Sequence, residues 1–346
     1  MAEYFESGSA SDVNDLLGKL RNAMTLHGGW TQQHLASDGT SGGQRAHLSK
    51  GNLKVNFRSG FNNELPTAHR NNRLGGWNWS MSGYSIDYLC MNLSSDFNFS
   101  NPWNGQPGAP GYAEGLAGMA FMLTAFGSIS RYWLFLLEDP DAVFLIVENR
   151  PDKFEYLAFG NLSLIQTVES GGEWFFGSRS MSHNYDQLRP PLETSFYNVT
   201  FSSQTSTQRN VKGFVRLVDS RYAASNSLSG WDNCRTYGVG GSYGGSSVLS
   251  TDLTTSYIEK EGRSILYPIA AIKGNMILGY IPHVARISMQ PYMPGEQVLG
   301  VGETYLAFPG HKRSVPWTMA GYGSSPYPAS TEEYNFHGTG IAIRRP

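Results

Sequence analysis

The sequence is poor in charged residues and in cysteine, and it has no long hydrophobic run. Of its 346 residues, 16% are Asp, Glu, Lys or Arg, against about 25% in a typical soluble domain. No apolar run approaches the roughly 20 residues that cross a bilayer, so we expect no membrane span. The opening MAEYFESGSASD has neither the basic nor the apolar region of a signal peptide. We therefore expect a protein that is made in a cytosol.

The two cysteines, Cys90 and Cys234, are too few for a disulfide framework. Cys90 lies in a strand-like stretch, and we expect both to be reduced and Cys90 to be buried. The net charge is −2 and the pI is about 6.4, which gives no indication of a polyanionic partner. Specific recognition of nucleic acid is therefore not expected.

Several enzyme motifs are missing as well. The chain contains no G-x-x-x-x-G-K-[ST], no H-E-x-x-H and no C-x-x-C. Its histidines show no ligand spacing: His27, His34, His47, His69, His183, His283, His311 and His337. Glu138, Asp139 and Asp141 cluster, but in a predicted turn, where acidic residues are common. We expect no catalytic residue, no cofactor and no metal, and hence a protein that is not an enzyme.

Short apolar runs separated by turn residues dominate the rest of the sequence. The stretch YWLFLLEDPDAVFLIVENRPDKFEYLAFG, 132–160, predicts three strands joined by two turns. Its first two runs are apolar at every position, which is typical of strands covered on both faces. We expect the cover to come from the chain's own second sheet and long loops, with a neighbouring subunit as the alternative.

One helix is predicted, over 12–24, with Ser11 as its cap and Gly28 and Gly29 as its stop. Helical spacing gives it a single apolar stripe, formed by Val13, Leu16, Leu17, Leu20 and Met24. The stripe is expected to be buried on the chain's own sheet, with docking on a neighbour left open.

Further strands are predicted wherever short β-prone runs lie between Gly, Pro and turn residues. They cover 45–48, 53–58, 78–81, 85–92, 173–176, 211–218, 266–272, 276–281, 284–288, 297–301, 303–308 and 340–344. The fold class is therefore mainly β, with antiparallel sandwich-like or barrel-like sheets, long loops and one short N-terminal helix. We expect an arm and helix over 1–30, a β domain over 31–189 and a second β region over 190–346, with packing of both regions as one unit left open.

The segment 226–250 is rich in Gly and Ser and is predicted to be a long exposed loop that a partner orders. It carries Trp231, Tyr237 and Tyr243, residue types that commonly anchor interfaces. Together with Leu16 and Leu20 of the helix, these three residues form the candidate interface.

Two segments resemble a family of tailed-bacteriophage virion structural proteins. One is FEYLAFGNLSLIQTVESGGEWFFGSRS, 154–180, and the other is ILYPIAAIKGNMILGYIPHVARISMQPYMPGEQVLGVGETYLAFPG, 265–310, followed by the closing FHGTGIAIRRP. The N-terminal AEYFESGSASDVNDLLGKL is similar too. The likeness is a pattern of aromatic residues and glycines, and it contains no catalytic residue to transfer to this chain.

The resemblance implies a non-enzymatic structural component of the virion, made in the cytoplasm of a bacterial host. It implies a collar or neck protein at the head–tail junction, in a symmetric ring that contacts copies of itself and other virion proteins of the connector, tail or baseplate. The alternative is a baseplate or tail-tip protein that binds a receptor or a cell-surface glycan, with Trp77 and Trp79 stacked on sugar rings. Their alternation, which places both on one strand face, instead favours a core or an interface. A virion-associated glycan hydrolase is a third hypothesis.

Overall fold

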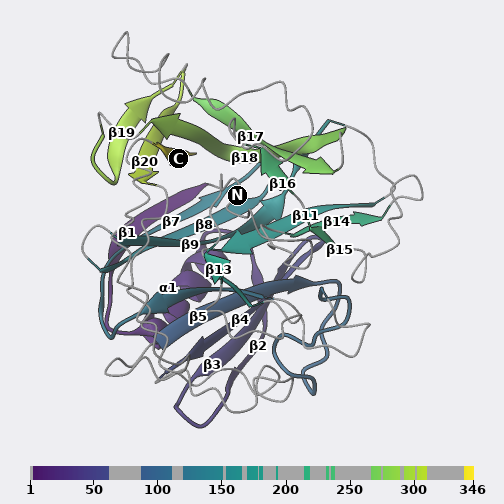
Figure 1. The fold of residues 1–346 in the computed structure, drawn as a ribbon. Coiled ribbons are helices and arrows are strands. Elements are labelled where there is room, and N and C mark those ends of the chain that lie inside the picture. The colour runs from purple at the N-terminus through teal and green to yellow at the C-terminus, as the bar shows by residue number, and fades with distance from the viewer. Residues whose placement is uncertain are drawn as a thin grey trace, which may run out of the picture.

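The computed structural model describes residues 3–61, 87–110, 120–150, 153–165, 170–177, 179–181, 192–193, 214–218, 231–233, 235–237, 266–273, 276–288, 292–300, 302–309 and 339–346. Within these ranges the protein is mainly β, with three antiparallel sheets and one short helix, as the sequence predicts. The sheets lie one above another (Figure 1). In this part of the chain, no helix has the length and apolar character needed to cross a membrane.

The helix α1 (Val13–Leu26) forms close to its predicted position. Its cap is Asp12 rather than Ser11: the Asp12 carboxylate accepts the backbone N–H of Asp15 at 2.8 Å. Asp15 in turn accepts the N–H of Ser11 at 2.8 Å. A carboxylate is a strong cap because it both accepts the free N–H and complements the helix dipole. At the other end the chain leaves the helix through Gly29, whose φ is +67°.

The middle sheet, sheet A, contains the predicted meander of 132–160. Across the sheet its strands are β1 (Tyr4–Ala10), β7 (Ile129–Leu137), β8 (Ala142–Arg150), β9 (Lys153–Asn161), β11 (Ser170–Gly177), β14 (Phe214–Val218) and β15 (Trp231–Asn233). The sheet draws strands from all three segments expected as domains, since β1 lies in 1–30 and β14 and β15 lie in 190–346.

Sheet B has the order β13 (Leu192–Glu193), β12 (Arg179–Met181), β6 (Ala120–Ala125), β5 (Asp87–Ser94), β4 (Leu53–Gly60), β3 (Gln44–Lys50) and β2 (Thr31–Ser37). Its β3–β4 hairpin was predicted, and the register pairs Leu48 with Val55. The strand β2 was not predicted, because TQQHLAS has no apolar alternation. The predicted strand 78–81 lies outside the described residues.

Sheet C has the order β16 (Arg235–Tyr237), β17 (Tyr267–Lys273), β18 (Met276–Ser288), β21 (Thr339–Arg344), β20 (Thr304–Pro309) and β19 (Glu296–Leu299), and β10 (Ser163–Leu164) also pairs with β18. The separate strands predicted at 276–281 and 284–288 are wrong, because they form the single strand β18. The β17–β18 register shifts between Ile281 and Ala285, and His283 there has a φ of +61°. A bulge of this kind bends a strand without ending it.

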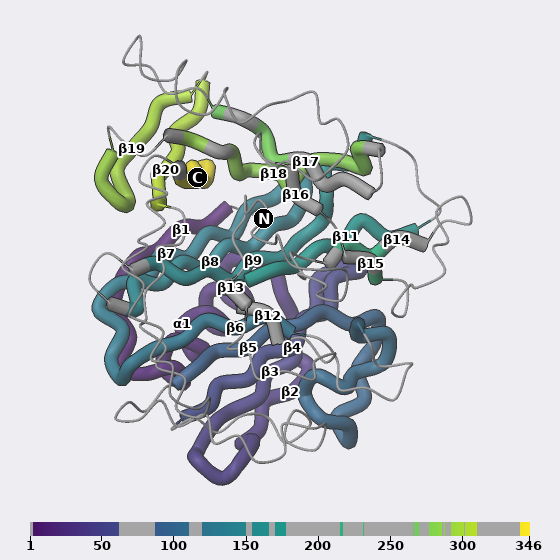
Figure 2. The backbone as a smooth tube through the Cα atoms, viewed as in Figure 1, coloured from purple at the N-terminus to yellow at the C-terminus, as the bar shows by residue number. Residues whose placement is uncertain are grey.

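Sheet A is covered on both faces by the chain itself (Figure 2). On one face Phe159 packs edge-on against Phe57 of sheet B and Trp30, with ring centroids 5.9 and 5.5 Å apart. On the other face Trp133 meets Phe308 of sheet C, with centroids 5.2 Å apart. Successive residues of a strand point to opposite faces, so a strand in the middle layer needs apolar residues at every position. This confirms the first of the two alternatives stated for the meander.

Candidate functional site

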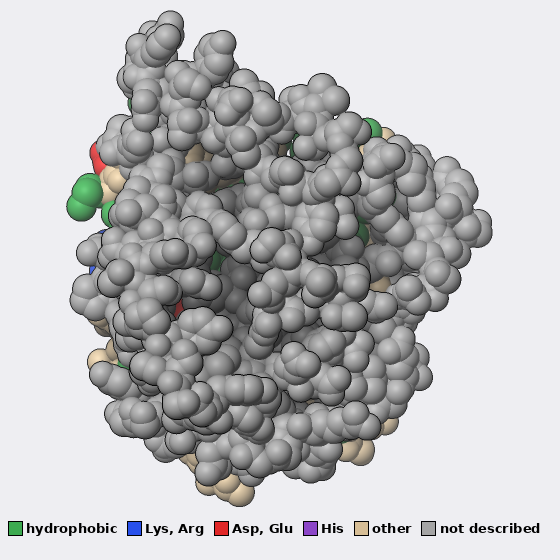
Figure 3. Space-filling model, in the orientation of Figure 1, with side chains coloured by type: hydrophobic (Ala, Val, Ile, Leu, Met, Phe, Trp, Pro, Cys, Tyr) green, Lys and Arg blue, Asp and Glu red, His purple; other side chains and the backbone are tan. Residues whose placement is uncertain are grey.

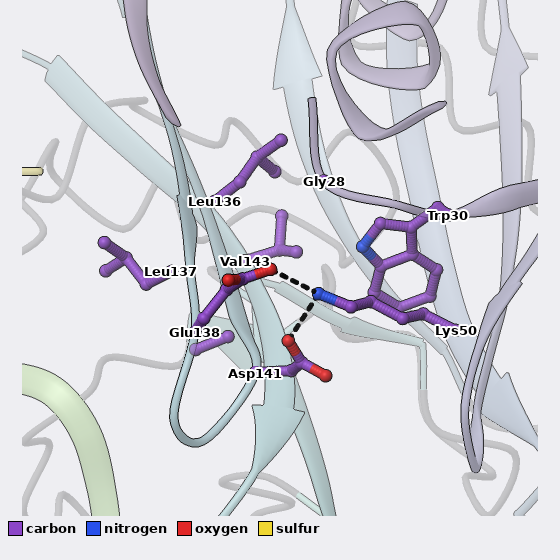
Figure 4. Close-up of a pocket in the computed structure, with 9 residues that line it drawn as sticks. Gly28, Trp30, Lys50, Leu136, Leu137, Glu138, Asp141 and Val143 are labelled. Atoms are coloured by element: carbon purple, nitrogen blue, oxygen red, sulfur yellow. Dashed lines mark hydrogen bonds and ion pairs between the residues drawn. The ribbon is translucent and has the colours of Figure 1, made fainter. Parts of the chain in front are cut away.

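The turn between β7 and β8, residues 138–141, joins the three layers of the molecule. On the sheet B side, Lys50 at the end of β3 donates to Glu138 Oε1 at 3.1 Å and to Asp141 Oδ1 at 2.6 Å. Figure 4 shows the Lys50 ammonium between the two carboxylates, beside Trp30. One lysine therefore ties β3 to both ends of the turn.

On the sheet C side, the same turn contacts β18 directly and is linked to β21 through His283 and Glu3. His283 Nε2 donates to the carbonyl oxygen of Pro140 at 2.9 Å, and Arg344 Nε donates to His283 Nδ1 at 3.2 Å. Arg344 also forms an ion pair with Glu3, whose carboxylate accepts the backbone N–H of Glu138 at 3.3 Å. Residues from both ends of the described chain thus meet at the turn.

The charges of this network are set by burial and by their partners. Burial opposes the charged form of Lys50, but the hydrogen bonds and the attraction of Asp141 and Glu138 outweigh it, so the pKa of Lys50 is raised. Burial likewise opposes the charged form of Glu138, and its hydrogen bond with Lys50 reverses the effect and lowers the pKa of Glu138. Burial lowers the pKa of His283, and this effect outweighs the hydrogen bond to Pro140, which by itself raises the pKa. Its two hydrogen bonds fit the neutral ring with the proton on Nε2.

The recess at this network is small. It has a volume of about 10 Å³ and is lined by Gly28, Trp30, Lys50, Leu136, Leu137, Glu138, Asp141, Ala142 and Val143. Such a volume holds about one water molecule, and both carboxylates are already bound to Lys50. The arrangement favours a clamp between the layers over a site for a small-molecule substrate.

A second polar cluster lies on the face of sheet B that points away from sheet A. Register places His34, His47, Asn56 and Asn92 side by side on β2, β3, β4 and β5. His47 Nδ1 is 2.7 Å from Asn56 Oδ1, and Asn56 Nδ2 donates to Asn92 Oδ1 at 3.0 Å. Asn92 Nδ2 in turn donates a hydrogen bond to the Asn104 carbonyl oxygen at 3.1 Å. Strand residues 34, 47, 56 and 92 show no shared motif in the sequence, so only the sheet register reveals this row.

The segment 95–110 covers this row. Arg45 holds it by donating to the carbonyl oxygens of Asn101 and Phe99 at 3.1 and 3.0 Å. Trp103 is 2% exposed and packs with Cys90. Burial lowers the pKa of His47 to about 4, and the nearby charges of Arg45 and His34 act in the same direction. His47, Asn56 and Asn92 therefore form a buried polar layer under a cover rich in aromatic residues.

The cysteine prediction is confirmed for Cys90, which carries a reduced thiol and is fully buried. Burial raises the pKa of its thiol to about 12, so the reactive thiolate is strongly disfavoured. Cys234 lies outside the described residues.

The candidate interface residues fall in different places. Leu16 and Leu20 are fully buried between α1 and the chain's own sheets, which confirms the predicted burial of the stripe. The structure accounts for this burial without a partner. Tyr237 belongs to β16, where its side chain is not described, and Tyr243 lies outside the described residues. Trp77 and Trp79 lie outside them as well.

The predicted exposed loop over 226–250 is wrong in its first half, because 231–233 and 235–237 form the strands β15 and β16. Trp231 is 1% exposed and packs edge-on against Phe175, with ring centroids 5.2 Å apart. Its indole N–H donates to the Gly108 carbonyl oxygen at 2.7 Å. A tryptophan with a hydrogen-bonded N–H is a stable core residue, and local composition does not distinguish it from an interface anchor.

Two stretches, 39–43 and 240–244, match the G-x-S-x-G pattern that surrounds the serine nucleophile of one hydrolase class. The first lies between β2 and β3 of a hairpin, whereas the hydrolase pattern requires a turn from a strand into a helix. Ser41 there accepts the backbone N–H of Phe61 at 3.3 Å. The second stretch lies outside the described residues.

Large apolar side chains are exposed mainly on sheet C. Of the eight exposed large hydrophobic residues among those described, five lie on or beside this sheet: Leu164, Ile165, Ile277, Met293 and Leu299. Leu164, Ile165 and Ile277 lie together, since β10 pairs with β18 and the Ile165 N–H donates to the Leu278 carbonyl. Leu299 is the last residue of β19, and Met293 lies shortly before its first residue. Figure 3 shows hydrophobic and acidic side chains projecting from the surface near this strand.

A comparison of the sequence with models of known protein families found no match. A search of the curated proteins also found no match.

Proposed function

We propose that this chain is a non-enzymatic structural subunit of a tailed-bacteriophage particle, in a symmetric ring at the collar or neck of the head–tail junction. The resemblance of 154–180 and 265–310 to virion structural proteins supports the proposal. The observation that carries it is the exposure of large apolar side chains in two separate groups on sheet C. In the group at β19, Leu299 is 81% exposed and Met293 is 71% exposed. In the group at β10 and β18, Ile165 is 54% exposed.

Two different apolar surfaces suit a ring. Subunits in a ring contact one another head to tail, so each copy needs two unlike surfaces that fit together. The group at β19 and the group at β10 and β18 are unlike and lie on different strands of one sheet. We therefore assign them to contacts between copies of this chain. The clamp at 138–141 would hold sheet C rigidly on the rest of the subunit.

Electron microscopy and native mass spectrometry of the purified chain test the ring. We expect the wild type to form a closed oligomer and Met293→Asp/Leu299→Asp to remain a monomer. The two proteins should unfold at similar urea concentrations, because the substituted residues are exposed in the subunit. Leu26→Asp is the matched control, because Leu26 is also exposed, at 76%, but ends the helix α1 far in sequence from sheet C. A monomer at high concentration, or a ring unaffected by the double substitution, would refute the assignment.

Antibody labelling of phage particles tests the position. Label at the head–tail junction is the expected result. Label at the tail tip, with binding of cell-surface glycan by the purified chain, would favour the receptor-binding alternative. Turnover of a polysaccharide would favour a glycan hydrolase and overturn the non-enzymatic role.

A further inference from the structure

His34 and His47 form a cross-strand pair at the edge of sheet B. They lie opposite each other in the β2–β3 ladder, and their ring centroids are 5.7 Å apart. Among the described residues, the Nε2 atoms of both rings are buried and have no hydrogen-bond partner. Buried polar atoms in native proteins are nearly always bonded, so these two ring nitrogens on neighbouring strands are candidates for binding a common ligand.

The hydrogen bonds of Asn56 fix the state of His47. Asn56 Nδ2 donates to Asn92 Oδ1 at 3.0 Å and to Ser94 Oγ at 3.1 Å, so the amide oxygen faces His47. That oxygen accepts a hydrogen bond from His47 Nδ1 at 2.7 Å. The ring proton is therefore on Nδ1, and Nε2 carries a free lone pair. Metal-binding histidines are commonly oriented in this way, by a hydrogen bond from the ring nitrogen that does not bind the metal.

The neighbouring aromatic rings hold both imidazoles in place. Phe99 stacks on His34 at 4.7 Å with an interplanar angle of 11°, and Phe97 packs edge-on against His47 at 5.5 Å. Phe99 is 37% exposed, so its ring lies between the histidine pair and solvent. A ligand that enters from solvent has to displace this ring.

We propose that His34 and His47 bind one divalent transition-metal ion of the Zn²⁺, Ni²⁺ and Cu²⁺ class through their Nε2 atoms. Imidazole nitrogen suits these borderline-soft ions. No group of three or more His, Cys, Asp or Glu suitable for a metal occurs in the described part of the chain. The protein therefore supplies two ligands, and water or a small anion completes the coordination.

Arg45 shapes the expected affinity. It lies two residues before His47 on the same face of β3, so its positive charge opposes a bare cation. The site should accordingly favour an ion that carries a bound hydroxide or chloride. Bound metal would join the edge strand β2 to β3. This role is independent of the proposed place in a virion, and it is an alternative to the expectation of no metal drawn from the histidine spacing.

Isothermal titration of the full-length chain with Cu²⁺ and Zn²⁺ tests the site, with electron paramagnetic resonance of the Cu²⁺ form. We expect one ion per chain that is lost in His34→Gln and in His47→Gln, and a Cu²⁺ spectrum with coupling to two imidazole nitrogens. His27→Gln is the control, because His27 stacks on Tyr4, away from the pair. The thermal midpoint should rise with Cu²⁺ in the wild type and the control only.

Binding that survives in His34→Gln would overturn the proposal, as would a Cu²⁺ spectrum with coupling to only one imidazole nitrogen. His34 is partly exposed, so His34→Gln decides the matter if His47→Gln fails to fold. Phe99→Ala gives a second readout: metal uptake should become faster while the ion-to-chain ratio stays the same. Unchanged uptake would contradict the placement of the ion beneath this ring.

Discussion

Lys50 Nζ lies 2.6 Å from Asp141 Oδ1, and this contact joins the end of β3 to the turn between β7 and β8. The lysine side chain is 15% exposed, and it also pairs with Glu138 at 3.1 Å. A single ammonium thus pairs with two carboxylates at the junction of sheets A and B.

Lys50→Met should destabilise the protein by about 1–3 kcal/mol, because it leaves two partly buried carboxylates without their charged partner. Urea unfolding followed by tryptophan fluorescence measures the change. Lys19→Met is the matched control: Lys19 pairs with Asp15 on the surface of α1, with side chains 37% and 35% exposed, and its loss should cost about 0.5 kcal/mol or less. Equal losses in the two variants would contradict the clamp.

Acid should weaken the contact between the turn and sheet C. The pKa of His283 is lowered in the folded protein, so its contribution to stability is complete above about 6.5 and is lost as pH falls toward the folded value. Protonation places a proton on Nδ1, which then can no longer accept from Arg344.

Unfolding free energies at pH 7.5 and 5.5 measure this effect, with His283→Asn as the non-titrating comparison. The wild type should lose more stability than the variant between these two pH values. The other histidines are common to both proteins, so their contributions cancel in the difference. The prediction fails if the two proteins respond equally to acid.

Phe308→Ala should cost about 3–5 kcal/mol, because the ring is fully buried between sheets A and C. It packs edge-on against Trp133 and Phe135, with centroids 5.2 and 6.1 Å apart. Met293→Ala changes an exposed residue beside the same sheet and should alter stability by less than about 0.5 kcal/mol. A small effect of Phe308→Ala on the urea midpoint would show that sheet C does not depend on this contact.

Leu16→Asp/Leu20→Asp should prevent folding, since it places two unpaired charges in the core. Both side chains are fully buried. Circular dichroism and size-exclusion chromatography measure the outcome. The control Leu26→Asp, on the same helix but 76% exposed, should fold normally. A folded, soluble double variant would place the apolar stripe outside the core.

Local signals in the sequence determined the helix and most of the strands. The stripe from Val13 to Met24 has helical spacing, and the runs of 132–160 are separated by turn residues, so neighbouring residues are enough to identify them. The capping residue was misplaced by one position because Ser11 and Asp12 are both good caps. The strands β1 and β2 escaped prediction because their mostly polar residues show no alternation, and pairing with β7 and β3 stabilises them instead.

Only the tertiary structure decided which surfaces meet. The all-apolar strands β7 and β8 required a cover on both faces, but the sequence left open whether the chain or a neighbour supplies it. Trp231 became a core residue because sheet A continues into β15. His34 and His47 face each other because of the hairpin register, and Lys50, His283 and Arg344 reach one turn because three sheets stack around it. Each of these contacts joins residues distant in the chain, and such contacts depend on packing that no local pattern encodes.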